Sequence, residues 1–144
     1  MKRMYVGALL LVIAIIACTV SLAQVTPAHQ AAVGVWDTDK GGQMEFYIQD
    51  GKLYAKVVAT EKGIDPNAKC TRCSGDLKDK PLMGAVLIYS FTPDSDGTWS
   101  GGRIADSKTG LIYQGKIKVE AATMTLRAYL GNPILGGSLV WKRH

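Results

Sequence analysis

Asp50-Gly51 stands between two stretches in which apolar and polar residues alternate. An Asp-Gly pair readily adopts the positive φ angles of a two-residue type I′ turn, and alternation with a period of two is typical of a strand with one buried face. The sequence therefore predicts an antiparallel hairpin whose register is set by the turn. On its buried face the expected facing pairs are Ile48 with Leu53, Phe46 with Ala55, and Met44 with Val57.

The strand pattern continues from Val33 to the end of the chain. About eight strands are expected in all. After the hairpin they cover residues 82–91, 98–104, 111–119, 123–130 and 137–143. The stretch 82–91 is apolar on both faces, so its register stays open. Short strands at this spacing, with no amphipathic helix of useful length between them, predict a single all-β domain over residues 33–144, either an antiparallel barrel or a sandwich.

Gly34-Val35-Trp36 opens the first predicted strand, and Trp141-Lys142-Arg143 ends the last one. A closed barrel brings its first and last strands together. A small residue two positions before a Trp lets the barrel close over the indole. An arginine laid on that ring, either Arg127 or Arg143, would add about 0.5 to 2 kcal/mol as a cation–π contact. Gly34, Trp36, Arg127 and Arg143 are therefore predicted to close the barrel.

Residues 1–23 have the pattern of a secretory signal peptide. Lys2 and Arg3 precede an apolar run from Val6 to Ala17, which is shorter than the roughly 18 residues of a membrane span. Ser21-Leu22-Ala23 then supplies the small residues of a cleavage site. We expect an exported protein, periplasmic or extracellular, whose mature chain begins at Gln24.

A second processing route competes with this one. Ile15-Ile16-Ala17-Cys18 is similar to a bacterial lipobox, in which Cys18 would be lipidated and would anchor the protein to a membrane. Membrane association is expected only in that case. Residues 24–32 show neither a strand period nor a punctuated helix, so they are predicted to be a short flexible lead.

Charge and composition argue against several classes of function. The net charge is +5, but Lys and Arg alternate with Asp and Glu, and no basic stripe suited to nucleic acid is formed. Nucleophilic and metal chemistry commonly need a rigidly held histidine, and the two histidines, His29 and His144, lie near the ends of the mature chain. Asp94 and Asp96 lack the further acids of a calcium loop. We expect no catalytic residue, no metal and no cofactor.

A long loop, residues 60–81, carries the motif Cys70-Thr71-Arg72-Cys73. Loops of this length are either functional or tied down. In an oxidising compartment Cys70 and Cys73 are expected to form a structural disulfide. Two alternatives stay open. A redox-active pair normally opens a helix within a βαβ unit, and a metal site would need two further ligands.

The loop motif begins a wider resemblance. The chain resembles the bacterial domain of unknown function 2147 family from Gly34 to Arg143, and this resemblance implies a small exported protein with a calycin-like, lipocalin-like β-barrel. It implies no established activity. Gly137 and Ser107 depart from the family pattern, which often has a basic residue and a Pro there. The matching residues are Cys70 to Gly75, Lys78, Pro81, Gly84, Trp99, Gly102, Asp106, Gly110, Tyr113, Arg127, Tyr129, Gly131, Gly136, Trp141 and Arg143.

Inward-facing aromatic and apolar residues are the candidates for ligand binding. A small barrel uses such residues either to fill its interior or to line a cavity for one small apolar or amphipathic molecule. Core packing is the simpler interpretation of each residue taken singly. The predicted ligand-binding set is Trp36, Phe46, Trp99, Tyr113, Leu126 and Trp141.

We expect an exported, non-catalytic binding protein. A thiol-redox protein that uses Cys70 and Cys73 is one alternative, and it would require an exposed, reactive cysteine. A structural or interaction protein of the bacterial envelope is the other. That alternative would require a filled barrel and an apolar patch on the outside. The sequence leaves the oligomeric state open.

Overall fold

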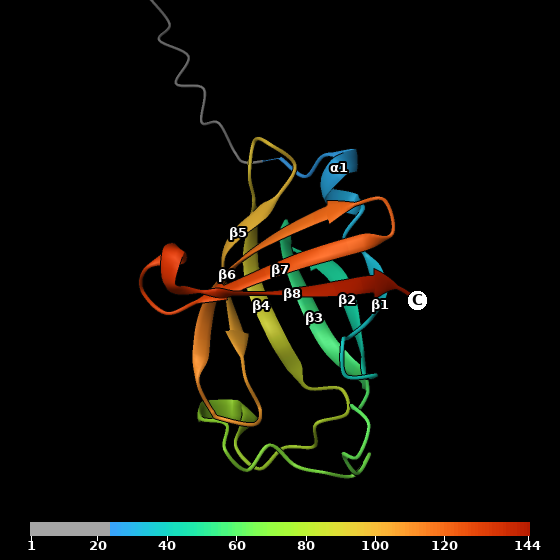
Figure 1. Ribbon diagram of the computed structural model, residues 1–144, viewed down its shortest axis with the longest axis vertical. Coiled ribbons are helices and arrows are strands. Elements are labelled where there is room, and N and C mark those ends of the chain that lie inside the picture. Colours follow the sequence, from blue (N-terminus) through green and yellow to red (C-terminus); the bar gives the residue numbers. More distant parts are fainter. Residues whose placement is uncertain (1–23) are drawn as a thin grey trace, which may run out of the picture.

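The computed structural model of the protein describes residues 24–144, and the predicted signal peptide and Cys18 lie outside them. Within this part of the chain, antiparallel strands form one closed barrel in which each strand pairs with its neighbours in sequence and β1 pairs with β8 (Figure 1). The predicted all-β barrel is confirmed. The strands are β1 (Gly34–Asp37), β2 (Gln43–Gln49), β3 (Lys52–Ala59), β4 (Val86–Pro93), β5 (Trp99–Ala105), β6 (Ile112–Glu120), β7 (Thr123–Tyr129) and β8 (Gly137–Arg143).

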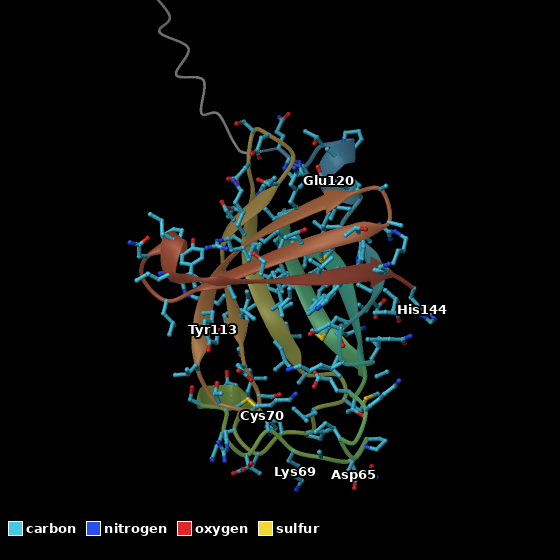
Figure 2. All side chains as sticks on the ribbon, in the orientation of Figure 1. Asp65, Lys69, Cys70, Tyr113, Glu120 and His144 are labelled. Atoms are coloured by element: carbon cyan, nitrogen blue, oxygen red, sulfur yellow. A yellow bond between two sulfur atoms is a disulfide. The ribbon has the colours of Figure 1, made fainter. Side chains whose placement is uncertain are left out.

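Three short helices accompany the strands within residues 24–144: α1 (Pro27–Gln30), η1 (Gly75–Leu77) and η2 (Pro133–Leu135). The helix α1 lies at one end of the barrel, and the long loop that contains η1 lies at the other (Figure 1). Figure 2 shows Asp65, Lys69 and Cys70 on this loop, far from Glu120 at the opposite end. Between residues 24 and 144, no helix is long and apolar enough to cross a membrane.

The β2–β3 hairpin has the register that its turn predicts. Asp50 has a φ of 50° and Gly51 a φ of 72°, as a type I′ turn requires. The three expected facing pairs all occur: Ile48 with Leu53, Phe46 with Ala55, and Met44 with Val57.

Strand β4 interrupts the simple alternation. Its pairing with β3 shifts register twice, and Ser90 has a positive φ of 62°. Ile88 and Phe91 are both buried although three positions separate them, because the irregularity returns Phe91 to the interior. β4 also begins at Val86, four residues later than the predicted strand. A pattern of period two could not assign this register.

The buried ring of Phe91 packs against two glycines that pair with each other on the neighbouring strands β5 and β6. A Cβ added at Gly102 on β5 would lie 1.9 Å from Cδ2 of Phe91, and one added at Gly115 on β6 would lie 2.8 Å from its Cζ. The space that two missing side chains leave is therefore filled by one aromatic ring.

The segment 24–32 differs from the predicted flexible lead, because α1 packs onto the barrel end and His29 is only 1% exposed. Nε2 of His29 lies 2.9 Å from the Asp94 carbonyl oxygen and 3.1 Å from that of Thr98, while Nδ1 accepts a hydrogen bond from the Thr26 N–H. Both carbonyls are acceptors, so the hydrogen resides on Nε2. Trp99 Nε1–H donates to the His29 carbonyl at 3.2 Å. Long-range hydrogen bonds thus order a segment that has no sequence periodicity.

The barrel closes where β1 meets β8, and Trp36 pairs there with Arg143. The Arg143 guanidinium lies 4.3 Å from the centroid of the Trp36 ring and donates a hydrogen bond to the Val33 carbonyl oxygen at 3.1 Å. Gly34 leaves space for this arrangement, since an added Cβ would lie 2.9 Å from Nη1 of Arg143. The cation therefore covers the indole and joins both chain ends.

Arg127, also predicted for this closure, lies elsewhere. It pairs with Ser138 across β7 and β8, on the face opposite to the buried Leu126. Its guanidinium donates to the carbonyl oxygens of Pro133 and Ile134. The position of Arg127 on β7 directs its side chain outward, away from Trp36. The side chain therefore binds η2 and does not cover the indole.

The β4–β5 turn contains an aspartate with a shifted titration. Asp96 accepts hydrogen bonds from the hydroxyl and the N–H of Thr98, at 2.5 and 3.1 Å. These bonds lower the pKa of Asp96 below 3.8, with a smaller contribution from the charge of Lys116. Because the pKa is lower in the folded than in the unfolded state, this carboxylate stabilises the fold at pH values above its unfolded pKa, and the contribution is lost as the pH falls.

Thr98→Val is expected to raise the pKa of Asp96 toward its ordinary value, because the valine is similar in shape but donates no side-chain hydrogen bond. The N–H of residue 98 remains, so the shift should be partial. A two-dimensional NMR titration of the Asp96 carboxyl measures it. Ser100→Ala is the control, since Ser100 donates to Asp94 instead. An unchanged Asp96 titration in Thr98→Val would contradict the assigned cause.

Candidate functional site

The predicted ligand-binding residues lie mainly within the core. Trp36, Phe46, Trp99, Leu126 and Trp141 are buried and belong to one packed cluster. The rings of Phe46 and Trp141 meet edge to face, with centroids 6.1 Å apart. Tyr113 is half-buried and pairs with Ile104 across β5 and β6. This set packs the barrel, and its contact with a ligand stays a prediction.

A shallow cleft of about 510 Å³, widely open to solvent, lies instead along the outside of the barrel wall. It joins side chains of β2, β3 and β4 to η1 in the long loop and to the first residue of β6. None of the predicted ligand-binding residues lines it. The lining residues are Tyr47, Gln49, Tyr54, Ser74, Gly75, Asp76, Leu77, Val86, Tyr89 and Ile112.

The strand alternation places three tyrosines on this wall. Tyr47 and Tyr54 face each other across β2 and β3, one position away from the buried Phe46 and Leu53, so they lie on the outer face. Their rings stack with centroids 5.8 Å apart and planes 18° apart. Tyr89 follows the buried Ile88 on β4 and has the same outward placement.

A cation already lies over one of these rings. The Nζ of Lys56 is 5.9 Å from the centroid of Tyr47, and it forms an ion pair with Glu45 at 3.0 Å. Lys56 and Glu45 face each other on β3 and β2, beside the tyrosine pair. The tyrosine pair of the cleft thus lies next to an ion pair, Lys56 with Glu45.

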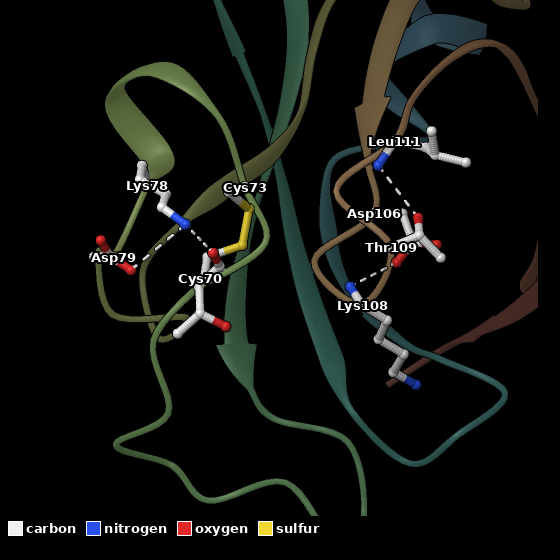
Figure 3. Close-up of a disulfide and its surroundings, with 9 residues drawn as sticks. Cys70, Cys73, Lys78, Asp79, Asp106, Lys108, Thr109 and Leu111 are labelled. Carbon is white, nitrogen blue, oxygen red and sulfur yellow. Dashed lines mark hydrogen bonds and ion pairs between the residues drawn. A yellow bond between two sulfur atoms is a disulfide. The ribbon is translucent and has the colours of Figure 1, made fainter.

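The loop wall of the cleft is tied by the disulfide (Figure 3). Cys70 and Cys73 are joined, as predicted, and are 1% and 6% exposed. The Cys70 N–H donates to the Lys80 carbonyl oxygen at 2.8 Å, and the Asp79 N–H donates to the Cys70 carbonyl oxygen at 3.1 Å. Ser74, which follows the disulfide, is the first of four consecutive residues that line the cleft. The disulfide therefore positions η1.

The same loop packs against the β5–β6 connection. A Cβ added at Gly110 would lie 2.1 Å from the Arg72 carbonyl oxygen, so only glycine permits this close approach. Lys78 donates to the Thr71 carbonyl oxygen and lies 4.0 Å from the Asp79 carboxylate (Figure 3). These contacts hold the segment between the two cysteines and η1 in one conformation.

The charge of the cleft is carried by Asp76. Among its lining residues, Asp76 alone has a charged side chain, and the others are aromatic, apolar or neutral polar. Within residues 24–144, Asp76 forms no ion pair. The cleft therefore offers aromatic faces and one exposed carboxylate that is in no ion pair within residues 24–144.

The histidines show no catalytic arrangement. His29 is held by Thr26, Asp94 and Thr98, and His144 is an exposed residue that contacts Asp37 at 2.9 Å. In the part of the chain that the structure describes, no group of three or more His, Cys, Asp or Glu residues could hold a metal ion.

Sequence reasoning did not select Tyr47, Tyr54, Tyr89 or Asp76. The outward pair Tyr47 and Tyr54 was available, because the hairpin register places these two residues opposite each other. Its connection to Tyr89 and to η1 depends on the path of the long loop, which no local pattern determines.

The fold is similar to that of a solved structure. Protein HP1028 from the human pathogen Helicobacter pylori, described as belonging to the lipocalin family, is similar to this chain with a TM-score of 0.70 and 19% sequence identity. The alignment covers 78% of this chain and 82% of that one. No curated protein matches. A likeness at this identity shows a lipocalin-like fold.

A family model matches residues 34–143, from the first residue of β1 to the last residue of β8. The match includes the disulfide loop, the cleft and the closure between Trp36 and Arg143, and among the regular elements within residues 24–144 it leaves out only α1. It covers well over half of the chain. The chain therefore belongs to the family described as uncharacterized proteins conserved in bacteria (DUF2147).

Proposed function

We propose that this protein is an exported, non-catalytic binding protein that holds a small amphipathic molecule in the cleft on its outer wall. The observation that carries the proposal is a cleft of about 510 Å³ in which three tyrosines meet a loop held by a disulfide. Clefts of about 300 to 1,000 Å³ with aromatic walls and a few polar groups are typical of small-molecule sites. The signal-like sequence of residues 1–23 supports export.

The packing favours the cleft over the barrel interior. Trp36 and Leu126 have no exposed surface, and Phe46 and Trp99 are 1% exposed. A ligand between these side chains would have to displace them, at the cost of the contacts that fill the core. A ligand in the cleft would meet side chains that are already half open to solvent, such as Tyr54 and Tyr89.

One observation favours a second candidate, an interaction protein of the envelope. The η2 loop presents Ile134 and Leu135 at 82% and 80% exposure, beside the exposed Leu130. Apolar side chains exposed together commonly mark contact surfaces. The redox alternative has less support, because both cysteines are buried within the loop.

Native mass spectrometry of the protein purified from the envelope of its own bacterium tests these candidates. We expect a monomer that begins at Gln24 and carries a noncovalent ligand of a few hundred daltons. Tyr54→Ala should lose this ligand, because it removes one wall of the cleft. Tyr129→Ala is the matched control, since Tyr129 lies on β7 and does not line the cleft.

Other outcomes would contradict parts of the proposal. Retention of the ligand by Tyr54→Ala would remove the cleft as the site. A bare chain that forms dimers, which separate in Ile134→Ser, would favour the interaction protein. A chain that begins with diacylated Cys18 would replace free export with a membrane anchor.

A further inference from the structure

We propose that the ligand of the cleft is a small organic cation, an alkylamine or a quaternary ammonium compound. This inference rests on the proposed binding function and adds the chemical class of the ligand. The lining residues Tyr47, Tyr54 and Tyr89 provide three phenol rings, and Asp76 provides the negative charge. Aromatic faces attract cations through the ring quadrupole, and clusters of such faces are a recurrent way to bind quaternary ammonium groups.

The electrostatic balance of the cleft favours a cation over an anion. Its lining includes no Lys, Arg or His. Lys56, which lies over the ring of Tyr47, forms an ion pair with Glu45 at 3.0 Å. Asp76 has no such partner within residues 24–144. Asp76 is exposed, and a bound cation in the cleft could pair with its carboxylate.

Lys56 places a positive charge beside the tyrosine wall. Its ammonium group lies 5.9 Å from the centroid of Tyr47, within the distance at which cation–π attraction operates. Tyr47 is stacked on Tyr54, so part of each ring is covered. The uncovered surfaces of Tyr54 and Tyr89 are therefore the principal faces left for a ligand.

The basic residue nearest to Asp76 along the chain is directed to other contacts. Lys78, two positions from Asp76, donates to the Thr71 carbonyl oxygen and lies 4.0 Å from Asp79. The disulfide and the close packing of Arg72 on Gly110 maintain this arrangement. The loop thus presents Asp76 to the cleft and keeps Lys78 paired with its neighbour.

The test uses choline as the probe and 3,3-dimethyl-1-butanol as its uncharged analogue of nearly the same shape. Each is titrated into the purified protein, and binding is followed by the amide NMR shifts of residues 74–77 and of Tyr89. We expect choline to shift these signals and to bind about tenfold more tightly than the alcohol, the ratio that about 1.4 kcal/mol of cation–π and carboxylate attraction produces.

Two substitutions test whether the charge of Asp76, and not the conformation of the loop, determines the affinity for choline. Asp76→Asn should weaken choline binding about five- to tenfold and leave binding of the alcohol unchanged, since a neighbouring carboxylate and an aromatic face each contribute on the order of 1 kcal/mol. Asp65→Asn is the matched control, because Asp65 is an exposed acid of the same loop that does not line the cleft. Asparagine keeps the side-chain oxygen that accepts a hydrogen bond from the Asn67 N–H there. In this control variant, the affinity for choline should change less than twofold.

The outcomes distinguish this inference from the proposed function. Equal affinity for choline and the alcohol, with no effect of Asp76→Asn, would overturn the cation and leave the cleft as a site for neutral ligands. Shifts for neither probe, with a ligand still present in native mass spectrometry, would also overturn it. Neither probe binding and no retained ligand would overturn the binding function itself.

Discussion

Trp36→Ala is expected to lower the free energy of unfolding by about 3 to 5 kcal/mol, the usual loss when a large aromatic ring is removed from a core. Trp36 has no exposed surface, and its indole N–H donates to the Ala32 carbonyl oxygen at 2.9 Å. The residue also stands on β1, which has few residues and joins β2 to β8. Urea unfolding followed by far-UV circular dichroism measures the change.

A double-mutant cycle tests whether Arg143 shares this role. Arg143→Met keeps an apolar stem but removes the charge over the indole, so its loss should be distinctly smaller than that of Trp36→Ala. Contacting residues couple by about 0.5 to 3 kcal/mol, and we expect coupling of that order for this pair. Arg127→Met is the control and should show additive losses with Trp36→Ala. A nearly neutral Trp36→Ala, or no coupling to Arg143, would show that the contact does not hold the chain ends together.

Gly102→Ala is expected to destabilise the barrel by about 1 to 3 kcal/mol or more, because it overpacks a filled core. The new Cβ would lie 1.9 Å from Cδ2 and 2.3 Å from Cγ of Phe91, which are not the flexible end of a side chain. Phe91 has no exposed surface, so its ring has no open side to move into. The same urea unfolding assay measures the loss.

Two further variants, one a rescue and one a control, test this prediction. Phe91→Leu should partly rescue Gly102→Ala, so the double variant should be more stable than the sum of the single losses implies. Gly137→Ala is the control, because nothing lies within 4 Å of a Cβ added there and its φ is not positive. If Gly102→Ala unfolded like Gly137→Ala, the packing assigned to Phe91 would be wrong.

Local patterns were sufficient where neighbouring residues decide the structure. The Asp50-Gly51 turn requires positive φ at two consecutive residues, and that requirement alone sets which side chains of β2 and β3 face each other. The same period of two predicts β6 and β7, because each of these strands has one face on the core. The meeting of Trp36 with the C-terminal arginine follows from barrel closure, which any closed sheet must satisfy.

Local sequence patterns could not predict the cleft. The hairpin register already places Tyr54 on the outer face, but Tyr89 was visible as an outward residue only once the irregular register between β3 and β4 was known. The contribution of Asp76 depends on how the disulfide loop returns toward the barrel wall. A pocket is formed by side chains from several elements, and periodicity describes one element at a time.

The sequence by itself determined the antiparallel strands, the hairpin register and the pairing of the chain ends, because alternation and turn chemistry act between residues that are close along the chain or forced together by closure. Only the tertiary structure decided that α1 covers one barrel end, that Phe91 fills the space beside Gly102, and that the cleft lies outside the barrel. His29 illustrates the reason: its partner Asp94 is 65 positions away, and a hydrogen bond between them exists only after the barrel has formed. Such contacts carry no local signature, since they depend on which surfaces the folded chain brings together.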